Sequence, residues 1–225
     1  MAATAEGAAA AGGCSSGRGA LVVLEGGDRC GKTTQAARVV EALNASGCPA
    51  ELWRFPDRTS PTGQMIDSYL RSASELDDRA VHLLFSANRW EKRTRMLEAL
   101  AQGTTLVVDR YAYSGASFTA AKGYDLGWCK APDAGLPRPD AVLFLELSLE
   151  AAEARGGYGA ERYEKRDFQA KVLKQFATLR EPWWSVVDAD RTQDAVFEDL
   201  KALTEKAVHS AKQAGSVADM QVLDW

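Results

Sequence analysis

Apolar residues along the chain follow two different periods, which separate short strands from amphipathic helices. Runs of mostly apolar residues occupy 20–24, 104–108 and 141–147, and such runs are typical of parallel strands that are buried on both faces. Shorter runs predict two more strands, at 51–55, where Pro56 follows, and at 183–187. The chain is therefore expected to contain five strands.

The segments between these strands carry apolar residues at helical spacing. The pattern predicts one helix that ends before Gly47, a single long helix over 81–100, a helix over 171–180 and a final helix over 192–213. Strands that alternate with helices favour a parallel sheet covered on both faces. The expected fold is thus α/β, with a five-stranded, mostly parallel sheet.

The length of 225 residues suits one such domain. Residues 1–19 are rich in Ala, Gly and Ser and lack the basic start and apolar core of a secretory signal, so we interpret them as a disordered leader. The folded domain is expected over 20–212, followed by a tail over 213–225. No apolar run approaches the length of a membrane span, and we expect a cytoplasmic location, with a nuclear or mitochondrial pool left open.

Composition excludes some classes of function. Lys and Arg total 27 against 31 Asp and Glu, and this net charge of -4 argues against a general nucleic-acid binder, which would need a basic surface. The four cysteines form no C-x-x-C pair and the chain has only two histidines, so a zinc site is not expected.

The residues after the first strand fit the phosphate-loop pattern G-x-x-x-x-G-K-[ST]. Gly26 and Gly31 permit tight turns in which successive backbone N–H groups point at a polyphosphate. Lys32 places a charge on the β and γ phosphates, and the Thr33 hydroxyl can ligate magnesium. A strand precedes the loop and a helix follows it, which is the context that this motif needs. We therefore expect the chain to bind a nucleoside triphosphate.

Two pairs of residues elsewhere suit a second nucleotide. Phe55 and Arg58 leave the end of the second strand, where they could wall a site and hold a phosphate; a solvated arginine in a capped turn is an equal alternative. Phe85 and Arg89 lie four residues apart on one helix face, so they could stack a base and donate to its carbonyl. From the residues alone, a core Phe with a surface Arg is the favoured alternative.

Two further features suit phosphate chemistry. Asp109 ends the third strand, which is the usual second position that organises magnesium beside a phosphate loop, and Arg110 would lie near the transferring phosphates. A cap for the following turn is the alternative for this aspartate. Residues 155–163 interleave glycines with arginines and favour a mobile lid, spanning about 145–169, over an ordinary flexible loop.

Several separate stretches resemble the thymidylate kinases of the eukaryotic type, over about residues 20 to 212. They are LEGGDRCGKTTQ from Leu24, RFPDR from Arg54, LLFSANRWE from Leu83, VVDRYAYSGASFTAAKG from Val107, GLPRPD from Gly135 and ERYE from Glu161. The resemblance implies a P-loop nucleoside monophosphate kinase that transfers the γ-phosphoryl group of magnesium-bound ATP to deoxythymidine monophosphate (dTMP), giving dTDP. It also implies a homodimer.

The same resemblance implies the roles of individual residues. Catalysis would fall to Asp28, Arg29, Lys32, Asp109 and Arg110, and magnesium to Thr33 and Asp109. ATP would contact Gly26, Arg29, Cys30, Gly31, Lys32, Thr33, Thr34, Arg155, Asp188 and Arg191. The acceptor dTMP would contact Asp28, Phe55, Arg58, Phe85, Arg89, Arg110, Ser114, Gly115, Phe118, Arg162, Tyr163 and Gln169.

Two other functions are compatible with a phosphate loop. A deoxynucleoside kinase would need a carboxylate as base for a sugar hydroxyl and would have no use for the Arg58 clamp. A regulatory protein that binds ATP without turnover is opposed by the intact set of Lys32, Arg29 and Asp109. The base motif N-K-x-D is absent, which counts against a GTP switch.

Cys30 lies within the phosphate loop, which suggests the hypothesis that its oxidation or alkylation would block ATP binding. The alternative is that Cys30 is only a small residue that fills space in the loop.

Overall fold

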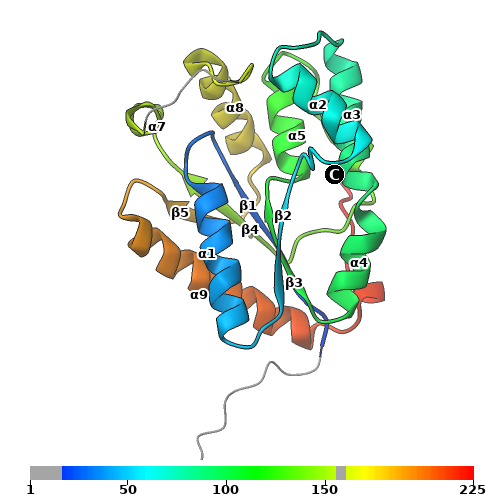
Figure 1. The fold of residues 1–225 in the computed structure, drawn as a ribbon, viewed down its shortest axis with the longest axis vertical. Coiled ribbons are helices and arrows are strands. Elements are labelled where there is room, and N and C mark those ends of the chain that lie inside the picture. Colours follow the sequence, from blue (N-terminus) through cyan, green and yellow to red (C-terminus); the bar gives the residue numbers. More distant parts are fainter. Residues whose placement is uncertain (1–16, 156–160) are drawn as a thin grey trace, which may run out of the picture.

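A five-stranded parallel sheet forms the centre of the computed structural model, which describes residues 17–155 and 161–225 (Figure 1). The strand order is β2-β3-β1-β4-β5, and every neighbouring pair is parallel. The predicted strands are confirmed, with ends displaced by one or two residues. Their bounds are β1 Leu21–Gly26, β2 Ala50–Arg54, β3 Thr105–Asp109, β4 Ala141–Glu146 and β5 Ser185–Asp188.

Successive residues of each central strand face opposite sides of the sheet, and helices bury both sides. In β1, Leu21 and Val23 belong to one core cluster, whereas Val22 and Leu24 belong to the other. Helices α1 and α9 cover one face, and α4, α5 and α8 cover the other (Figure 1). Their bounds are α1 Lys32–Ala45, α4 Arg93–Ala101, α5 Ala112–Ala120, α8 Arg166–Leu179 and α9 Gln193–Gln213.

The single long helix predicted over 81–100 is wrong, because the chain forms two helices there. Helix α3 spans Asp78–Trp90, and α4 begins at Arg93 after a turn at Glu91 and Lys92. Both helices keep the same apolar period and no Gly or Pro marks the break, so the sequence pattern continues across it. The break lets α4 pack on β3 while α3 packs against α2, Pro61–Leu70.

Four helices were not predicted, although three of them carry cap signals. Ser60 precedes α2 and its hydroxyl accepts a hydrogen bond from Gly63 N at 3.1 Å, with Pro61 in the first turn. Ser148 caps α7, Leu149–Ala154, in the same way. Asp125 caps the third, α6, Leu126–Lys130, by accepting a hydrogen bond from Trp128 N at 2.8 Å, and the fourth is α5. Helix α8 begins at Arg166, before the predicted start at 171.

Both ends of the described chain contact the domain. Arg18 forms an ion pair with Asp140 at 2.6 Å, so chain that was expected to be leader is packed from this residue onward; residues 1–16 lie outside the described residues. At the other end, backbone hydrogen bonds of 2.8 Å join Leu223 to Gly135 and Leu136, so the expected tail lies along the segment before β4. Among the described helices, none has the length and apolar character that crossing a membrane requires.

Candidate active site

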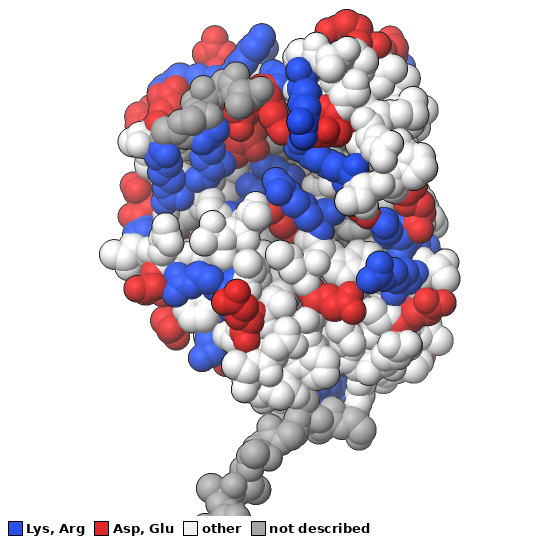
Figure 2. Space-filling model, viewed as in Figure 1, with Lys and Arg blue, Asp and Glu red and all other residues white. Residues whose placement is uncertain are grey.

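A cleft of about 450 Å³ opens at the carboxyl ends of β1, β2 and β3, which is where parallel sheets bind their ligands. Figure 2 shows a hollow in this face in which Lys and Arg side chains gather. Most of the predicted site residues line it, although they come from separate segments. They are Asp28, Arg29, Gly31, Lys32, Thr33, Thr34, Phe55, Arg58, Phe85, Arg89, Asp109, Arg110, Ser114, Gly115, Phe118, Arg155 and Tyr163.

The phosphate loop turns between β1 and α1 at two glycines in conformations that other residues avoid. Gly26 has a φ of 142°, and a Cβ there would lie 2.5 Å from the carbonyl oxygen of Leu145 on the neighbouring strand. Gly31 has a φ of 96° and directly precedes α1. Glycine is therefore required at both positions, and the turn brings the loop amides and the amino end of α1 to the cleft.

Lys32 is held inside the loop by backbone carbonyls. Its Nζ donates to Gly27 O at 2.6 Å and Gly26 O at 3.1 Å, and it lies 3.3 Å from Cys30 Sγ. These contacts fix the ammonium group at the floor of the loop, where phosphate oxygens would compete for it. Cys30 is only 3% exposed and does not line the cleft, which favours its interpretation as a small filler residue.

Thr33 and Asp109 meet at the end of β3. The Thr33 hydroxyl donates to Asp109 Oδ2 at 2.6 Å, and the side chain of Arg54, which sequence reasoning did not assign, approaches the same oxygen at 3.6 Å. Asp109 Oδ1 is buried and has no hydrogen-bond partner among the described residues. An unused carboxylate oxygen beside a hydroxyl suits magnesium, which takes oxygen ligands. No group of three or more His, Cys, Asp or Glu within the described residues could hold a metal alone.

The two predicted catalytic arginines have strained backbones. Arg29 has a φ of 63° and Arg110 a φ of 69°, values that cost energy in residues other than glycine and that cluster at functional sites. Arg110 is held in place because it pairs with Asp28 and donates to Gly26 O at 3.3 Å and to Ser114 Oγ at 3.1 Å. The fold therefore fixes this guanidinium beside the phosphate loop.

Glu25 fixes the backbone on the carboxyl side of Arg110, and sequence reasoning missed this residue. It is fully buried, and it accepts hydrogen bonds from Tyr111 N at 2.9 Å and from Ser114 N and Oγ at 3.0 and 2.6 Å. Burial raises the pKa of Glu25, while the Ser114 hydrogen bond and the charge of Arg110 oppose that rise. Its signal in the sequence is an acidic residue inside an otherwise apolar strand.

Asp28 is held from the other side by α8. Gln169 Nε2 donates to Asp28 Oδ2 at 2.5 Å, and Gln169 Oε1 accepts from Asp28 N at 3.1 Å. Gln169 is 1% exposed and does not line the cleft. It contacts the cleft through Asp28, and its predicted contact with dTMP stays a prediction.

Arg58 lies in the cleft between two carboxylates. Its Nη1 is 2.6 Å from Asp67 Oδ1 and 2.8 Å from Glu161 Oε1, and Glu161 also lines the cleft. A second residue of the predicted lid, Glu164, pairs with Arg29 at 3.3 Å. Two carboxylates of the 161–164 segment thus contact the two arginines that were predicted to bind phosphates.

The loop that carries Arg58 is fixed by Asn88 of α3, which is fully buried. Its Oδ1 accepts from Asp57 N at 2.7 Å, and its Nδ2 donates to Asp57 O at 3.1 Å, to Ser60 Oγ at 3.0 Å and to Glu91 Oε1 at 2.9 Å. No pattern in the sequence signals this role. On the same helix, Phe85 and Arg89 both line the cleft, as predicted for a base pocket.

Besides Gln169 and the loop residues Gly26 and Cys30, three predicted residues do not line the cleft. Arg162 donates to Tyr69 O at 2.9 Å and pairs with Glu75 at 2.6 Å, which holds it against the segment after α2. Arg191 donates to Asp188 O at 3.1 Å, outside the cleft. Of the expected adenine side only Arg155 lines the cleft, and it donates to Ala189 O at 2.6 Å. The positions Arg162, Asp188 and Arg191 keep their roles as predictions only.

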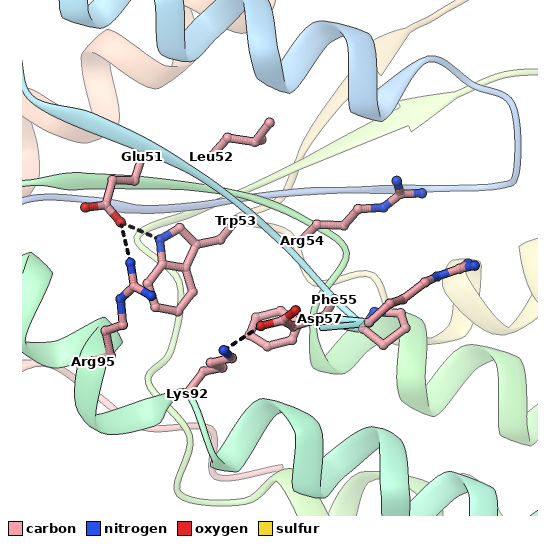
Figure 3. A pocket seen from close by; sticks show the side chains of 10 residues that line it. Glu51, Leu52, Trp53, Arg54, Phe55, Asp57, Lys92 and Arg95 are labelled. Carbon is pink, nitrogen blue, oxygen red and sulfur yellow. Dashed lines mark hydrogen bonds and ion pairs between the residues drawn. The ribbon is translucent and has the colours of Figure 1, made fainter. Parts of the chain in front are cut away.

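A second cavity, of about 520 Å³, runs along the edge strand β2 beside α4. Figure 3 shows two ion pairs among its charged groups, Lys92 with Asp57 at 2.5 Å and Arg95 with Glu51 at 3.9 Å, and Trp53 Nε1 also donates to Glu51 at 2.8 Å. No residue of the phosphate loop or of the β3 end lines it. The smaller cleft, which contains these residues, is therefore the candidate active site.

Comparison with known proteins gives one consistent result. A family model described as thymidylate kinase matches residues 24–200. The chain is similar to the thymidylate kinase of Arabidopsis thaliana, at 54% identity over 84% of this chain and 74% of the relative, and to that of Homo sapiens, at 52% over 87% and 94%. Among solved structures, a thymidylate kinase from Candida albicans aligns with a TM-score of 0.79 at 40% identity, covering 85% of this chain and 93% of that chain.

Proposed function

Because this chain belongs to the thymidylate kinase family, we propose that it transfers the γ-phosphoryl group of ATP to dTMP, giving dTDP and ADP. The observation that carries the proposal is one cleft with two cationic sides. The phosphate loop with Lys32 forms one side, and Arg58, which leaves the end of β2, forms the other. A kinase that transfers a phosphoryl group from one nucleotide to another needs a cationic group on both sides, whereas a nucleoside kinase needs only the phosphate loop.

On the donor side, ATP phosphates would lie in the loop between Gly26 and Thr33. Lys32 would exchange its backbone carbonyl partners for the β and γ phosphates. Thr33 and Asp109 would hold magnesium, and the unused Oδ1 of Asp109 supports that assignment. When bound, magnesium would neutralise charge on the phosphate oxygens and keep them in position.

On the acceptor side, Arg58 would hold the dTMP phosphate. Glu161 and Asp67 now occupy the positions around its guanidinium, so the phosphate would displace a carboxylate that already satisfies this charge. The thymine would stack on Phe85, where stacking of a base on an aromatic ring is worth about 1 to 3 kcal/mol. Phe118 and Tyr163, whose ring centroids lie 5.6 Å apart, would enclose the deoxyribose.

Phosphoryl transfer depends more on the positioning of the reactants and on positive charge than on a general base. An oxygen of the acceptor phosphate, which is ionised at neutral pH, attacks the γ phosphorus of ATP as the bond to the β-phosphate oxygen breaks and ADP leaves. Arg110 is fixed between Asp28 and the loop, and Arg29 lies within the loop, so both can stabilise charge on the migrating group. The ion pair of Arg29 with Glu164 would have to open first.

We also propose a homodimer and a cytoplasmic location. The dimer is supported by large apolar side chains exposed on two helices that pack together: Met65 of α2 is 50% exposed, and Leu83 of α3 is 49% exposed. The lid over about 145–169 belongs to the same proposal; residues 156–160 of it lie outside the described residues.

The test is ADP formation from magnesium-ATP with a panel of acceptors: dTMP, thymidine, and the monophosphates of deoxyuridine, deoxyguanosine and uridine. Wild type is compared with Arg58→Ala and with Arg71→Ala, a matched control, because the exposed Arg71 pairs with the same Asp67 at 2.9 Å. We expect a strong preference for dTMP, with a KM for dTMP about 100-fold higher in Arg58→Ala and unchanged in Arg71→Ala.

Two other results would replace this proposal. If thymidine reacts and dTMP does not, the chain is a deoxynucleoside kinase. If ATP binds but no acceptor yields ADP, the chain is a regulatory ATP-binding protein.

A further inference from the structure

The side chain of Arg89 is held by a buried carboxylate from a segment far away in the sequence. Arg89 Nε donates to Asp133 Oδ1 at 3.0 Å, and Nη2 donates to Asp133 Oδ2 at 2.6 Å. The two side chains are 2% and 0% exposed. Two parallel hydrogen bonds fix the plane of a guanidinium as well as its position, which a single bond does not.

Asp133 is itself fixed to α3 by other residues. Ser86 Oγ donates to Asp133 Oδ1 at 2.8 Å and to the carbonyl of Pro132 at 3.0 Å, and Trp90 Nε1 donates to the same carbonyl at 2.8 Å. Residues 131–133 form a short turn that therefore contacts α3 at three side chains. The carboxylate has no freedom to follow a moving arginine.

Helix α5 confines the other side of the guanidinium. A Cβ at Gly115 would lie 2.7 Å from Arg89 Nη2 and 3.1 Å from Nη1, so only glycine leaves room for the arginine in this position. The two bonds to Asp133 use Nε and Nη2, and Nη1 has no hydrogen bond among the described residues, although Arg89 lines the cleft. One donor group of a fixed guanidinium thus remains for a ligand.

We propose that Asp133 is a positioning residue that sets the selectivity for the acceptor base. By fixing the plane of Arg89, it directs the Nη1 donors at a base carbonyl. Thymine carries a carbonyl oxygen at the position where cytosine carries an amino group, so a fixed donor binds the first and is left unpaired against the second. This inference rests on the proposed function, because it assumes that the cleft binds dTMP.

A purely structural role is the competing account, in which Asp133 only neutralises a buried arginine. That role predicts lower stability in Asp133→Asn and no change in the relative use of acceptors. The positioning role predicts that the relative use of dTMP and deoxycytidine monophosphate (dCMP) changes even when the protein stays folded. The ratio of the two kcat/KM values separates the accounts.

The experiment measures kcat and KM for dTMP, dCMP and ATP, together with the Tm, in wild type, Asp133→Asn and Ser86→Ala. Asp125→Asn is the matched control, since it makes the same change in the preceding helix cap, where Asn also caps well. We expect Asp133→Asn to raise the KM for dTMP and to lower the dTMP to dCMP ratio, each about tenfold, with the KM for ATP unchanged. Ser86→Ala should shift the ratio in the same direction by less, and Asp125→Asn should leave it unchanged.

A wild-type ratio in Asp133→Asn would overturn the inference. If Asp133→Asn does not fold, Ser86→Ala decides, and a wild-type ratio there would overturn it. Failure of the wild type to phosphorylate dTMP would instead overturn the proposed function on which the inference rests.

Discussion

The two sides of the cleft are held in different ways. On the donor side, Lys32 bonds to carbonyls five and six residues away, inside one loop. On the acceptor side, Arg58 pairs with Asp67, 9 residues away, but also with Glu161, 103 residues away, and Arg89 pairs with Asp133, 44 residues away. The loop around Lys32 is therefore a local structure, whereas the Thr33–Asp109 pair and the acceptor side form only once the whole domain has folded.

This difference has a consequence for substitutions. A change in the phosphate loop should affect the chemical step directly, because the loop touches the transferring phosphates. A change in the supporting residues of the acceptor side should raise the KM for dTMP and leave the KM for ATP unchanged. The contrast fails if supporting residues such as Asn88 affect both substrates equally.

The largest effect is expected on the donor side, from Lys32→Ala. Loss of its charge should lower kcat about 100- to 1000-fold, the range seen when one donor to a transition-state oxyanion is removed. Steady-state ADP formation measures this loss, and Lys206→Ala, at an exposed lysine of α9, is the control. A rate near wild type in Lys32→Ala would show that the loop does not bind the transferring phosphate.

Asn88→Ala should give the next largest effect, on the acceptor side. Removal of the amide leaves buried partners in the 57–60 loop unsatisfied, which should lower the free energy of unfolding by about 2 to 4 kcal/mol and raise the KM for dTMP. Urea unfolding and steady-state kinetics check both effects. The control is Asn44→Ala, because Asn44 bonds to Ala50 N and O, both at 3.0 Å, away from the cleft. An equal rise in the KM for dTMP in both variants would contradict the assignment of Asn88.

Gly115→Ala adds a methyl group against Arg89, which Asp133 prevents from moving away. We expect the KM for dTMP to rise about tenfold while the KM for ATP stays constant, since overpacking costs about 1 to 3 kcal/mol. Gly127→Ala in α6 is the control. An unchanged KM for dTMP would mean that Arg89 can shift without cost, and it would weaken the case for a fixed base pocket.

The smallest effect concerns pH. His82 of α3 is fully buried, with its Nδ1 2.8 Å from Thr119 Oγ1, and Thr119 lines the cleft. Burial, aided by the charge of Arg89, lowers the pKa of His82 from 6.5 to about 4. Between these two values the unfolded chain binds a proton at His82 that the folded chain excludes. The stability that neutral His82 allows is therefore complete above pH 6.5 and is lost as the pH falls toward 4.

The corresponding measurement is urea unfolding of wild type and His82→Gln at pH about 7.5 and about 5.5. Wild type should lose about 1 kcal/mol more than the variant over this interval. Equal losses in the two proteins would contradict the inferred shift in the pKa of His82.

The same contrast between local and long-range contacts explains which features of the fold the sequence predicts. The five strands and the phosphate loop follow from apolar runs and glycine spacing, which are local properties, and the structure contains them. The break between α3 and α4 was missed because packing against β3 and α2 causes it, while the apolar period continues unchanged. The local apolar period cannot show that the first half of this stretch packs on one element and the second half on another.

The supporting residues of the site were missed for the same reason. Glu25 and Asn88 lie within stretches that resemble the family and Asp133 lies outside them, but none of the three was given a role, because their roles depend on partners that only the fold brings near. Glu25 alone left a trace, as a charge within an apolar strand. Arg162 illustrates the reverse case, because its position in a matching motif does not reveal that Glu75 holds it outside the cleft.

The central claim is phosphoryl transfer between two nucleotides bound in one cleft, and transfer of a labelled γ-phosphate tests it most directly. The full chain is incubated with magnesium, γ-labelled ATP and dTMP, and the products are separated. The account predicts label in dTDP, with one dTDP formed for each ADP. Label that appears only as inorganic phosphate, or in dTMP when thymidine is the acceptor, would contradict it.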